Sequence, residues 1–167
     1  MAHGPRYRVA RRRRREGKTD FRTRINLLRS GLPRAVVRKS HRNVIVQLIE
    51  FDPAGDRVIT TAQAFDLRKH GWKGSTANTP AAYLTGYLAG TKALSSGVKS
   101  AVLDIGLSAP TKGGRVFATL KGMVDAGLDI PYSEDVVPPE ERIRGEHISE
   151  DMKGQFETVK AEIKGAK

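Results

Sequence analysis

The residue types best placed to do chemistry lie near the start of the sequence, where five arginines follow one another: Arg11, Arg12, Arg13, Arg14 and Arg15. Guanidinium groups remain charged and can bind phosphate oxygens through two parallel hydrogen bonds, so such a run suits a phosphate backbone. The chemistry that this segment indicates is binding of a polyanion.

An aromatic residue accompanies the arginines. Tyr7 lies between Arg6 and Arg8, in a stretch whose composition gives it no core to join. We therefore expect its ring to stack on an unpaired base rather than to pack inside the protein.

The excess positive charge is confined to one end of the chain. Of 167 residues, 30 are Lys or Arg and 18 are Asp or Glu, a net charge of +12. Residues 1–50 hold fifteen basic and three acidic side chains, and residues 51–167 hold fifteen of each. Nucleic acid or an anionic membrane would suit this charge, and a solubility tail is the simpler alternative. Because residues 1–19 carry few large apolar groups, nucleic acid is favoured, and an extended arm beside a sheet favours RNA.

Two later loops offer further contacts. Trp72 lies between Lys69 and Lys73, which suits base stacking beside phosphates, but a tryptophan covering the edge of the core fits equally well. Lys112 and Arg115 flank two glycines where a strand is expected to lead into a helix. Helix N-termini bind anions, so a phosphate contact is expected there, with an ordinary turn as the alternative. The loop lacks the Gly-Lys-Ser/Thr signature of nucleotide-binding proteins.

Catalytic groups are sparse. Glu50, Asp104 and Asp125 are the carboxylates that neighbouring elements could bring together, as a metal-dependent nuclease of the ribonuclease H type requires. Such a nuclease, using Asp104, is the alternative function. The histidines lack zinc-ligand spacing, no serine lies in a nucleophile elbow, and cysteine is absent. We expect a protein that is not an enzyme, with no metal, no cofactor and no small-molecule substrate.

The hydropathy of the sequence indicates in which compartment of the cell the protein resides. No apolar run approaches the roughly 18 to 20 residues that span a bilayer, and residues 1–20 lack the apolar stretch of a secretory signal. The sequence therefore predicts a cytoplasmic protein with no membrane partner.

Periodicity predicts the elements that position these residues. An extended arm over residues 1–18 leads into a helix capped by Thr19 or Asp20 and stopped at Gly31. Strands are expected over residues 34–39, 43–51, 57–62 and 101–105, and helices over residues 80–95 and 113–127. The order βββαβα, with antiparallel neighbours and one parallel crossover, predicts an α/β fold with a mixed sheet of ribonuclease H-like topology.

Composition divides the chain into three parts. Residues 1–30 form a basic arm and first helix, residues 31–130 an α/β core domain, and residues 131–167 a C-terminal helical extension. In the extension, residues 149–164 have one apolar face, which we expect to form a surface helix that docks on a neighbouring protein.

Several motifs together point to a known family. They are RRRRREGKTDF at 11–21, PRAVVRKS at 33–40, GSTANTPAAY at 74–83, LDIG at 103–106 followed by GGRVF at 113–117, DAGLDIP at 125–131 and RGEHI at 144–148. These motifs span nearly the whole chain. The sequence resembles the archaeal-type protein eighteen of the large ribosomal subunit, a universal 5S rRNA-binding family.

The resemblance implies a structural RNA-binding protein. Members bind 5S rRNA and attach it to the large (50S) subunit in the central protuberance, where they touch 23S-type rRNA and neighbouring ribosomal proteins. It also implies an α/β sandwich related to ribonuclease H. Carried over by position, the rRNA-contacting side chains would be Arg6, Arg8, Arg11, Arg12, Arg13, Arg14, Arg15, Lys18, Arg22, Arg24, Arg34, Arg38, Lys39 and Arg42.

Overall fold

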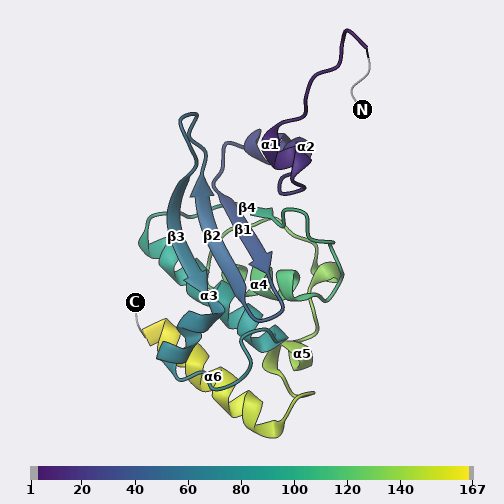
Figure 1. The fold of residues 1–167 in the computed structure, drawn as a ribbon. Coiled ribbons are helices and arrows are strands. Elements are labelled where there is room, and N and C mark those ends of the chain that lie inside the picture. The colour runs from purple at the N-terminus through teal and green to yellow at the C-terminus, as the bar shows by residue number, and fades with distance from the viewer. Residues whose placement is uncertain (1–3, 166–167) are drawn as a thin grey trace.

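A four-stranded mixed sheet forms the centre of the protein (Figure 1). The computed structural model describes residues 4–165, apart from the side chain of Glu150. Strands β1 (Arg34–Lys39), β2 (Val44–Glu50) and β3 (Arg57–Gln63) pair antiparallel, and β4 (Val102–Asp104) lies parallel to β1. The strand order is β3-β2-β1-β4. The α/β fold and the mixed sheet predicted from the sequence are confirmed.

Two helices cover one face of this sheet. They are α3 (Thr79–Ser95) and α4 (Arg115–Asp125). Helix α3 begins where expected, because the Asn78 side chain accepts a hydrogen bond from the Ala81 amide at 2.9 Å and Pro80 occupies the first turn. Alternate residues of the strands, such as Val37 and Val46, are buried in the core on this side.

Helices α3 and α4 approach each other closely at glycines. A Cβ atom at Gly86 would lie 2.0 Å from the carbonyl oxygen of Thr119, and one at Gly122 would lie 2.1 Å from that of Tyr83. The absence of side chains at both positions therefore allows backbone to pack on backbone, which fixes the distance between the two helices.

The C-terminal part packs on the same core. It contains the 3₁₀ helix η2 (Glu134–Val136) and helices α5 (Glu140–Arg144) and α6 (Glu150–Gly165). Phe156, Val159 and Ile163 of α6 are buried with the residues of α3 and of the 3₁₀ helix η1 (Ala64–His70). The amphipathic helix was predicted correctly, but the expectation that its apolar face docks on another protein is corrected: that face covers this chain's own core.

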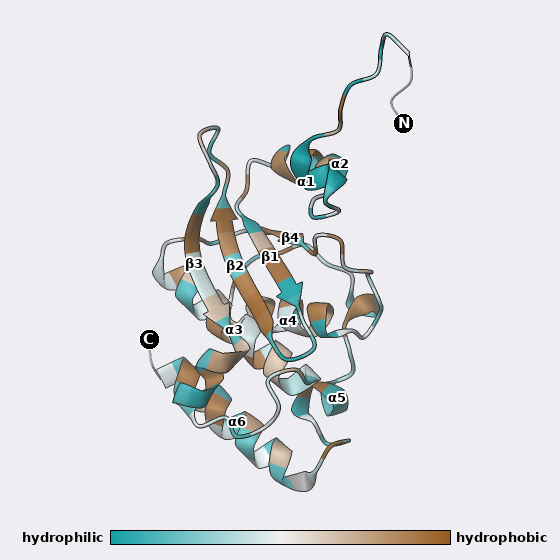
Figure 2. Cartoon of the chain, in the orientation of Figure 1, coloured by the Kyte–Doolittle hydropathy of each residue, from teal (hydrophilic) through white to brown (hydrophobic). Residues whose placement is uncertain are grey.

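The N-terminal segment lies at the opposite end of the molecule from α6 (Figure 1). It folds as a single turn, α1 (Arg12–Arg15), and a short helix, α2 (Phe21–Leu28), neither of which has a buried residue. Both helices are largely hydrophilic, in contrast to the apolar strands β1 and β2 (Figure 2). The described part of the arm that was predicted to be extended, residues 4–18, thus contains one helical turn.

The remaining differences concern short elements. The sequence predicts no helix or strand between residues 62 and 80, yet η1 occupies the first part of this stretch, with Leu67 in the core. Among the described residues, no helix is long and apolar enough to cross a membrane.

Candidate nucleic-acid interface

The basic arm folds back on the start of α2. Asp20 caps α2: its carboxylate accepts hydrogen bonds from the Arg22 amide at 2.9 Å and from the Thr23 hydroxyl at 2.9 Å. These hydrogen bonds, that of the Thr23 side chain first, lower the pKa of Asp20. Arg13 Nε then donates to the Thr19 hydroxyl at 2.8 Å, which ties the arginine run to the helix it precedes.

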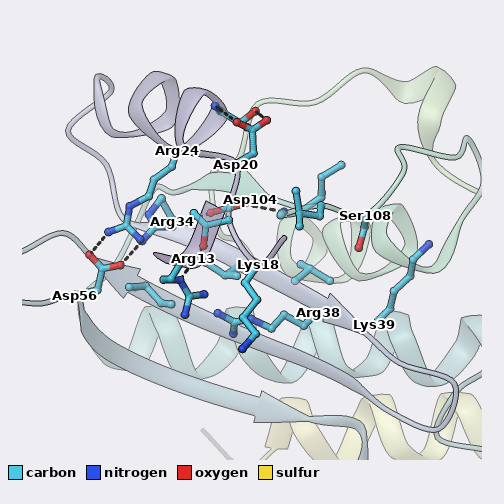
Figure 3. Close-up of a pocket in the computed structure, with 18 residues that line it drawn as sticks. Arg13, Lys18, Asp20, Arg24, Arg34, Arg38, Lys39, Asp56, Asp104 and Ser108 are labelled. Atoms are coloured by element: carbon cyan, nitrogen blue, oxygen red, sulfur yellow. Dashed lines mark hydrogen bonds and ion pairs between the residues drawn. The ribbon is translucent and has the colours of Figure 1, made fainter. Parts of the chain in front are cut away.

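A cleft of about 700 Å³ separates this arm from the sheet (Figure 3). Its floor includes the apolar side chains of Val36 and Ile49. Basic side chains from three elements and their connections line it, namely Arg13, Lys18, Arg24, Arg34, Arg38 and Lys39. Residues far apart in the sequence therefore form one cationic surface over β1, which is the geometry expected for holding a phosphate backbone.

Acidic residues at one end of the cleft form an ion-pair network. Arg34 donates from Nη1 to Asp104 at 2.7 Å and from Nη2 to Asp56 at 2.6 Å, and Arg24 donates to the other Asp56 oxygen at 2.8 Å. The Arg34 side chain is only 5% exposed. The prediction that Arg34 contacts rRNA is therefore corrected, because its terminal nitrogens are committed to aspartates inside the protein.

Two further residues predicted to contact RNA, Trp72 and Arg115, bind atoms of their own chain. Trp72 is 2% exposed, and its indole N–H donates to the carbonyl oxygen of Ser75 at 3.1 Å. The prediction that Trp72 stacks on a base is therefore wrong. The alternative interpretation, that Trp72 covers the edge of the core, is confirmed. Arg115 is partly exposed, and its Nη1 donates to the carbonyl oxygens of Ser40 at 3.1 Å and Ala77 at 2.8 Å. This guanidinium joins two loops of its own chain, and its contact with RNA stays a prediction.

The other predicted side chains are accessible. Tyr7 is 52% exposed. Arg24 is partly buried, and the basic residues that are exposed are Arg6, Arg8, Arg11, Arg12, Arg13, Arg14, Arg15, Lys18, Arg22, Arg38, Lys39, Arg42, Lys69, Lys73 and Lys112. Whether each of them contacts RNA remains a prediction.

Sequence reasoning missed two features. The first is Asp56, whose role depends on partners 22 and 32 residues away. The second is Phe65, which is 45% exposed with the Arg68 guanidinium 5.2 Å from its ring centroid. No local pattern distinguishes Phe65 from an ordinary core aromatic, so its exposure had no signal in the sequence.

Comparison with known proteins agrees with the resemblance seen in the motifs. The family described as "Ribosomal large subunit proteins 60S L5, and 50S L18" matches residues 5–99 and 95–133. The chain belongs to this family.

Two archaeal relatives extend the match over most of the sequence, and each is named large ribosomal subunit protein uL18. The protein from Methanococcoides burtonii is 52% identical, over 98% of this chain and 97% of the relative. That from Methanothermobacter thermautotrophicus is 55% identical, over 90% of this chain and 78% of the relative. The resemblance to proteins of the large ribosomal subunit is therefore confirmed.

For a member of this ribosomal family, the carboxylates of the alternative nuclease hypothesis have other roles. Asp104 binds Arg34 through one oxygen and the Gly106 amide through the other, at 2.9 Å. Asp125 accepts from the Tyr83 hydroxyl at 2.7 Å and pairs with Lys121 at 3.0 Å, which raises the pKa of Lys121. Among the described side chains, those of residues 4–149 and 151–165, no three from His, Asp or Glu lie close enough together to hold a metal ion.

Proposed function

We propose that this protein binds 5S rRNA and attaches it to the 23S-type rRNA of the large subunit, in the central protuberance, as a structural constituent without catalysis. The observation that carries the proposal is the cationic cleft, in which Arg13 and Lys18 of the arm face Arg38 and Lys39 of β1. Family membership supports the same function, since the relatives are large-subunit proteins.

The arm has far more positive charge than its own acids can neutralise. Within its described part, residues 4–18, the ion pairs are those of Arg12 at 3.9 Å and Lys18 at 3.0 Å, both with Glu16. The other arginines of residues 4–18 are exposed and have no acidic partner among the described residues, so mutual repulsion disfavours their crowding unless an anion is bound. RNA phosphates supply that anion, and release of their counterions drives the association.

The three parts of the chain then have separate tasks. Residues 1–30 contact RNA, residues 31–130 form the core that directs them, and residues 131–167 brace that core through α6. Attachment to the rest of the subunit requires a second surface. We assign contacts outside the cleft to Lys69, Lys73 and Lys112, which are exposed and do not line it, and to neighbouring ribosomal proteins.

Competition between RNAs tests this function. The purified protein is bound to labelled 5S rRNA on filters, and unlabelled tRNA or unlabelled 5S rRNA is added as competitor. We expect 5S rRNA to displace the label at much lower concentration than tRNA, because the cleft and the arm fit one folded RNA. Equal displacement by both RNAs would show a generic polyanion binder and would contradict the proposal.

A further inference from the structure

Among the described residues, a single side-chain hydrogen bond joins the basic arm and α2 to the sheet region, beside the packing of α2 against β4 and the chain connection to β1. Helices α1 and α2 bury no residue, and the described hydrogen bonds of residues 4–30 are otherwise local. Among the side-chain hydrogen bonds and ion pairs of these residues, only that from Arg24 to Asp56, at 2.8 Å, reaches the sheet region. The position of the arm over the sheet therefore depends in part on an acidic side chain between β2 and β3, because the other contacts of α2 are few.

Asp56 is itself held firmly from the other side. Its second oxygen accepts a hydrogen bond from Arg34 at 2.6 Å, and Arg34 is anchored to Asp104 of β4 at 2.7 Å. Because Arg34 is buried, its guanidinium has little freedom to move. The direction of the Asp56 carboxylate, and with it the place of Arg24, is thus fixed by the core (Figure 3).

We propose that Asp56 is a positioning residue for RNA binding. It acts through Arg24 to hold α2 over β1, so that Arg13 and Lys18 of the arm and Arg38 of β1 form one surface instead of two independent ones. This inference rests on the proposed function. An acidic side chain beside an RNA site repels phosphate, so charge alone predicts that removal of Asp56 tightens RNA binding. The positioning role predicts the opposite, that its removal weakens RNA binding.

Two variants with the same change in charge test whether loss of the Asp56 carboxylate weakens or tightens RNA binding. Asp56→Asn and Asp52→Asn each raise the net charge by one, and both positions lie in the connection between β2 and β3. Asp52 is exposed, and among the described residues its carboxylate accepts only from the Ala54 amide, at 2.9 Å, a bond that asparagine can keep. We expect Asp56→Asn to weaken binding of 5S rRNA about ten-fold, within the range of coupling in ion-pair networks, and Asp52→Asn to leave it unchanged or slightly tighter. Unchanged or tighter binding by Asp56→Asn would overturn the inference.

A double-mutant cycle tests the route through Arg24. Arg24→Gln removes the outer partner of Asp56 and is expected to weaken binding by itself. If Asp56 acts through Arg24, then Asp56→Asn adds little in the Arg24→Gln background. Fully additive losses would show that Asp56 acts on RNA binding by another route. Asp56→Glu keeps the carboxylate and is expected to restore part of the affinity.

The position of the arm can be measured without RNA. Because the sequence contains no cysteine, spin labels can be placed at Asn26→Cys on α2 and Lys99→Cys on the body, both exposed. We expect a narrow distance distribution in the otherwise unchanged protein and in Asp52→Asn, and a broad one in Asp56→Asn. Thermal melting of each variant checks its fold, and should Asp56→Asn not fold, Arg24→Gln is expected to broaden the distribution equally. An unchanged distribution in the folded variants would overturn the inference.

The two proposals fail separately. If the unaltered protein does not prefer 5S rRNA over tRNA, the proposed function is wrong, yet the label distances still report whether Asp56 places the arm. If the unaltered protein prefers 5S rRNA while Asp56→Asn changes neither the affinity nor the distances, only the positioning role is wrong.

Discussion

Burial decides what each arginine of this protein can do. Arg34 and Arg38 lie on the same face of β1, four residues apart, yet the first is 4% exposed and ion-paired while the second is exposed and donates to Gln47. A buried guanidinium without its aspartates would carry an uncompensated charge, whereas an exposed one remains hydrated. Arg34 therefore supports the fold, and Arg38 is available for phosphate.

Replacement of each arginine should distinguish the role of Arg34 in stability from that of Arg38 in phosphate binding. We expect Arg34→Met to lower the free energy of unfolding by about 3–5 kcal/mol, because it leaves Asp56 and Asp104 without their shared partner. The same change at the exposed Arg38 should cost no more than about 0.5 kcal/mol. Urea denaturation followed by circular dichroism measures both values. Equal costs at the two positions would contradict the assignment.

Tyr7 and Trp72, the two aromatic residues considered for base stacking, allow a second comparison of variants. Trp72→Phe removes the hydrogen bond to Ser75 and some packing, and should cost about 1–2 kcal/mol of stability without changing RNA affinity. Tyr7→Ala should leave stability unchanged and weaken RNA binding by about 1–3 kcal/mol. Denaturation and filter binding of the two variants measure these effects. A loss of RNA affinity in well-folded Trp72→Phe would contradict the account of Trp72.

At the scale of elements, the packing of α3 on α4 depends on missing side chains. Gly86→Ala would place a Cβ atom 2.0 Å from a backbone oxygen, so we expect the helices to separate at a cost of about 1–3 kcal/mol or more. Gly154→Ala in α6 is the matched control, since nothing lies within 4 Å of its added Cβ. It should stabilise the protein by up to about 1 kcal/mol through helix propensity. Thermal melts that shift in the same direction for both variants would refute this packing argument.

The start of α2 should respond to acid. The pKa of Asp20 is lowered in the folded protein by its hydrogen bonds to Thr23 and Arg22, so its capping contribution is complete above the unfolded pKa near 3.8 and is lost as the pH falls through the lower, folded value. Amide chemical shifts of Arg22 and Thr23 between pH 6 and about 2.5 follow this loss. Asp20→Asn, which also caps helices, should abolish the titration. A midpoint at or above 3.8 would contradict the lowered pKa.

Elements with a local signal were predictable from the sequence. The run of Ala35, Val36 and Val37 defined β1, and Asn78 with Pro80 defined the start of α3. The turn α1 was not predictable, because four arginines carry no amphipathic pattern. For α6, the pattern showed that a face is covered but not by which surface, since its partners in α3 and η1 are distant in sequence.

The residues of the candidate site also divide into those whose exposure or burial was predictable from the sequence and those for which it was not. The exposure of the arginine run and of Tyr7 could be predicted, because the composition of the arm excludes a core position. The burial of Arg34 could not, because its partner Asp104 is 70 residues away in the sequence. Trp72 was ambiguous for a related reason: a tryptophan between lysines fits a stacking platform or a core edge, and only the tertiary structure distinguishes them.

At the scale of the whole molecule, charge and packing are segregated. The basic arm lies at one end, where Arg24 of α2 pairs with Asp56, and α6 covers the neutral body at the other (Figures 1 and 2). Association with RNA should therefore depend on where positive charge is placed and not only on how much there is. This is the central claim of the proposed function.

The most direct test is the salt dependence of 5S rRNA binding in two variants of equal charge. One replaces Arg11, Arg12, Arg13, Arg14 and Arg15 with glutamine, and the other does the same to five exposed basic residues elsewhere, Arg57, Lys99, Arg142, Lys153 and Lys164. For the arm variant we predict a large loss of affinity and a slope of log K against log salt that is shallower by about 4, since each lost phosphate contact removes about 0.7–0.9. The control should keep a slope within about 1 of the unaltered protein. If the slope of log K against log salt became shallower by the same amount in both variants, RNA binding would depend on the net charge alone. That result would contradict the claim that the arginines of the arm bind the RNA.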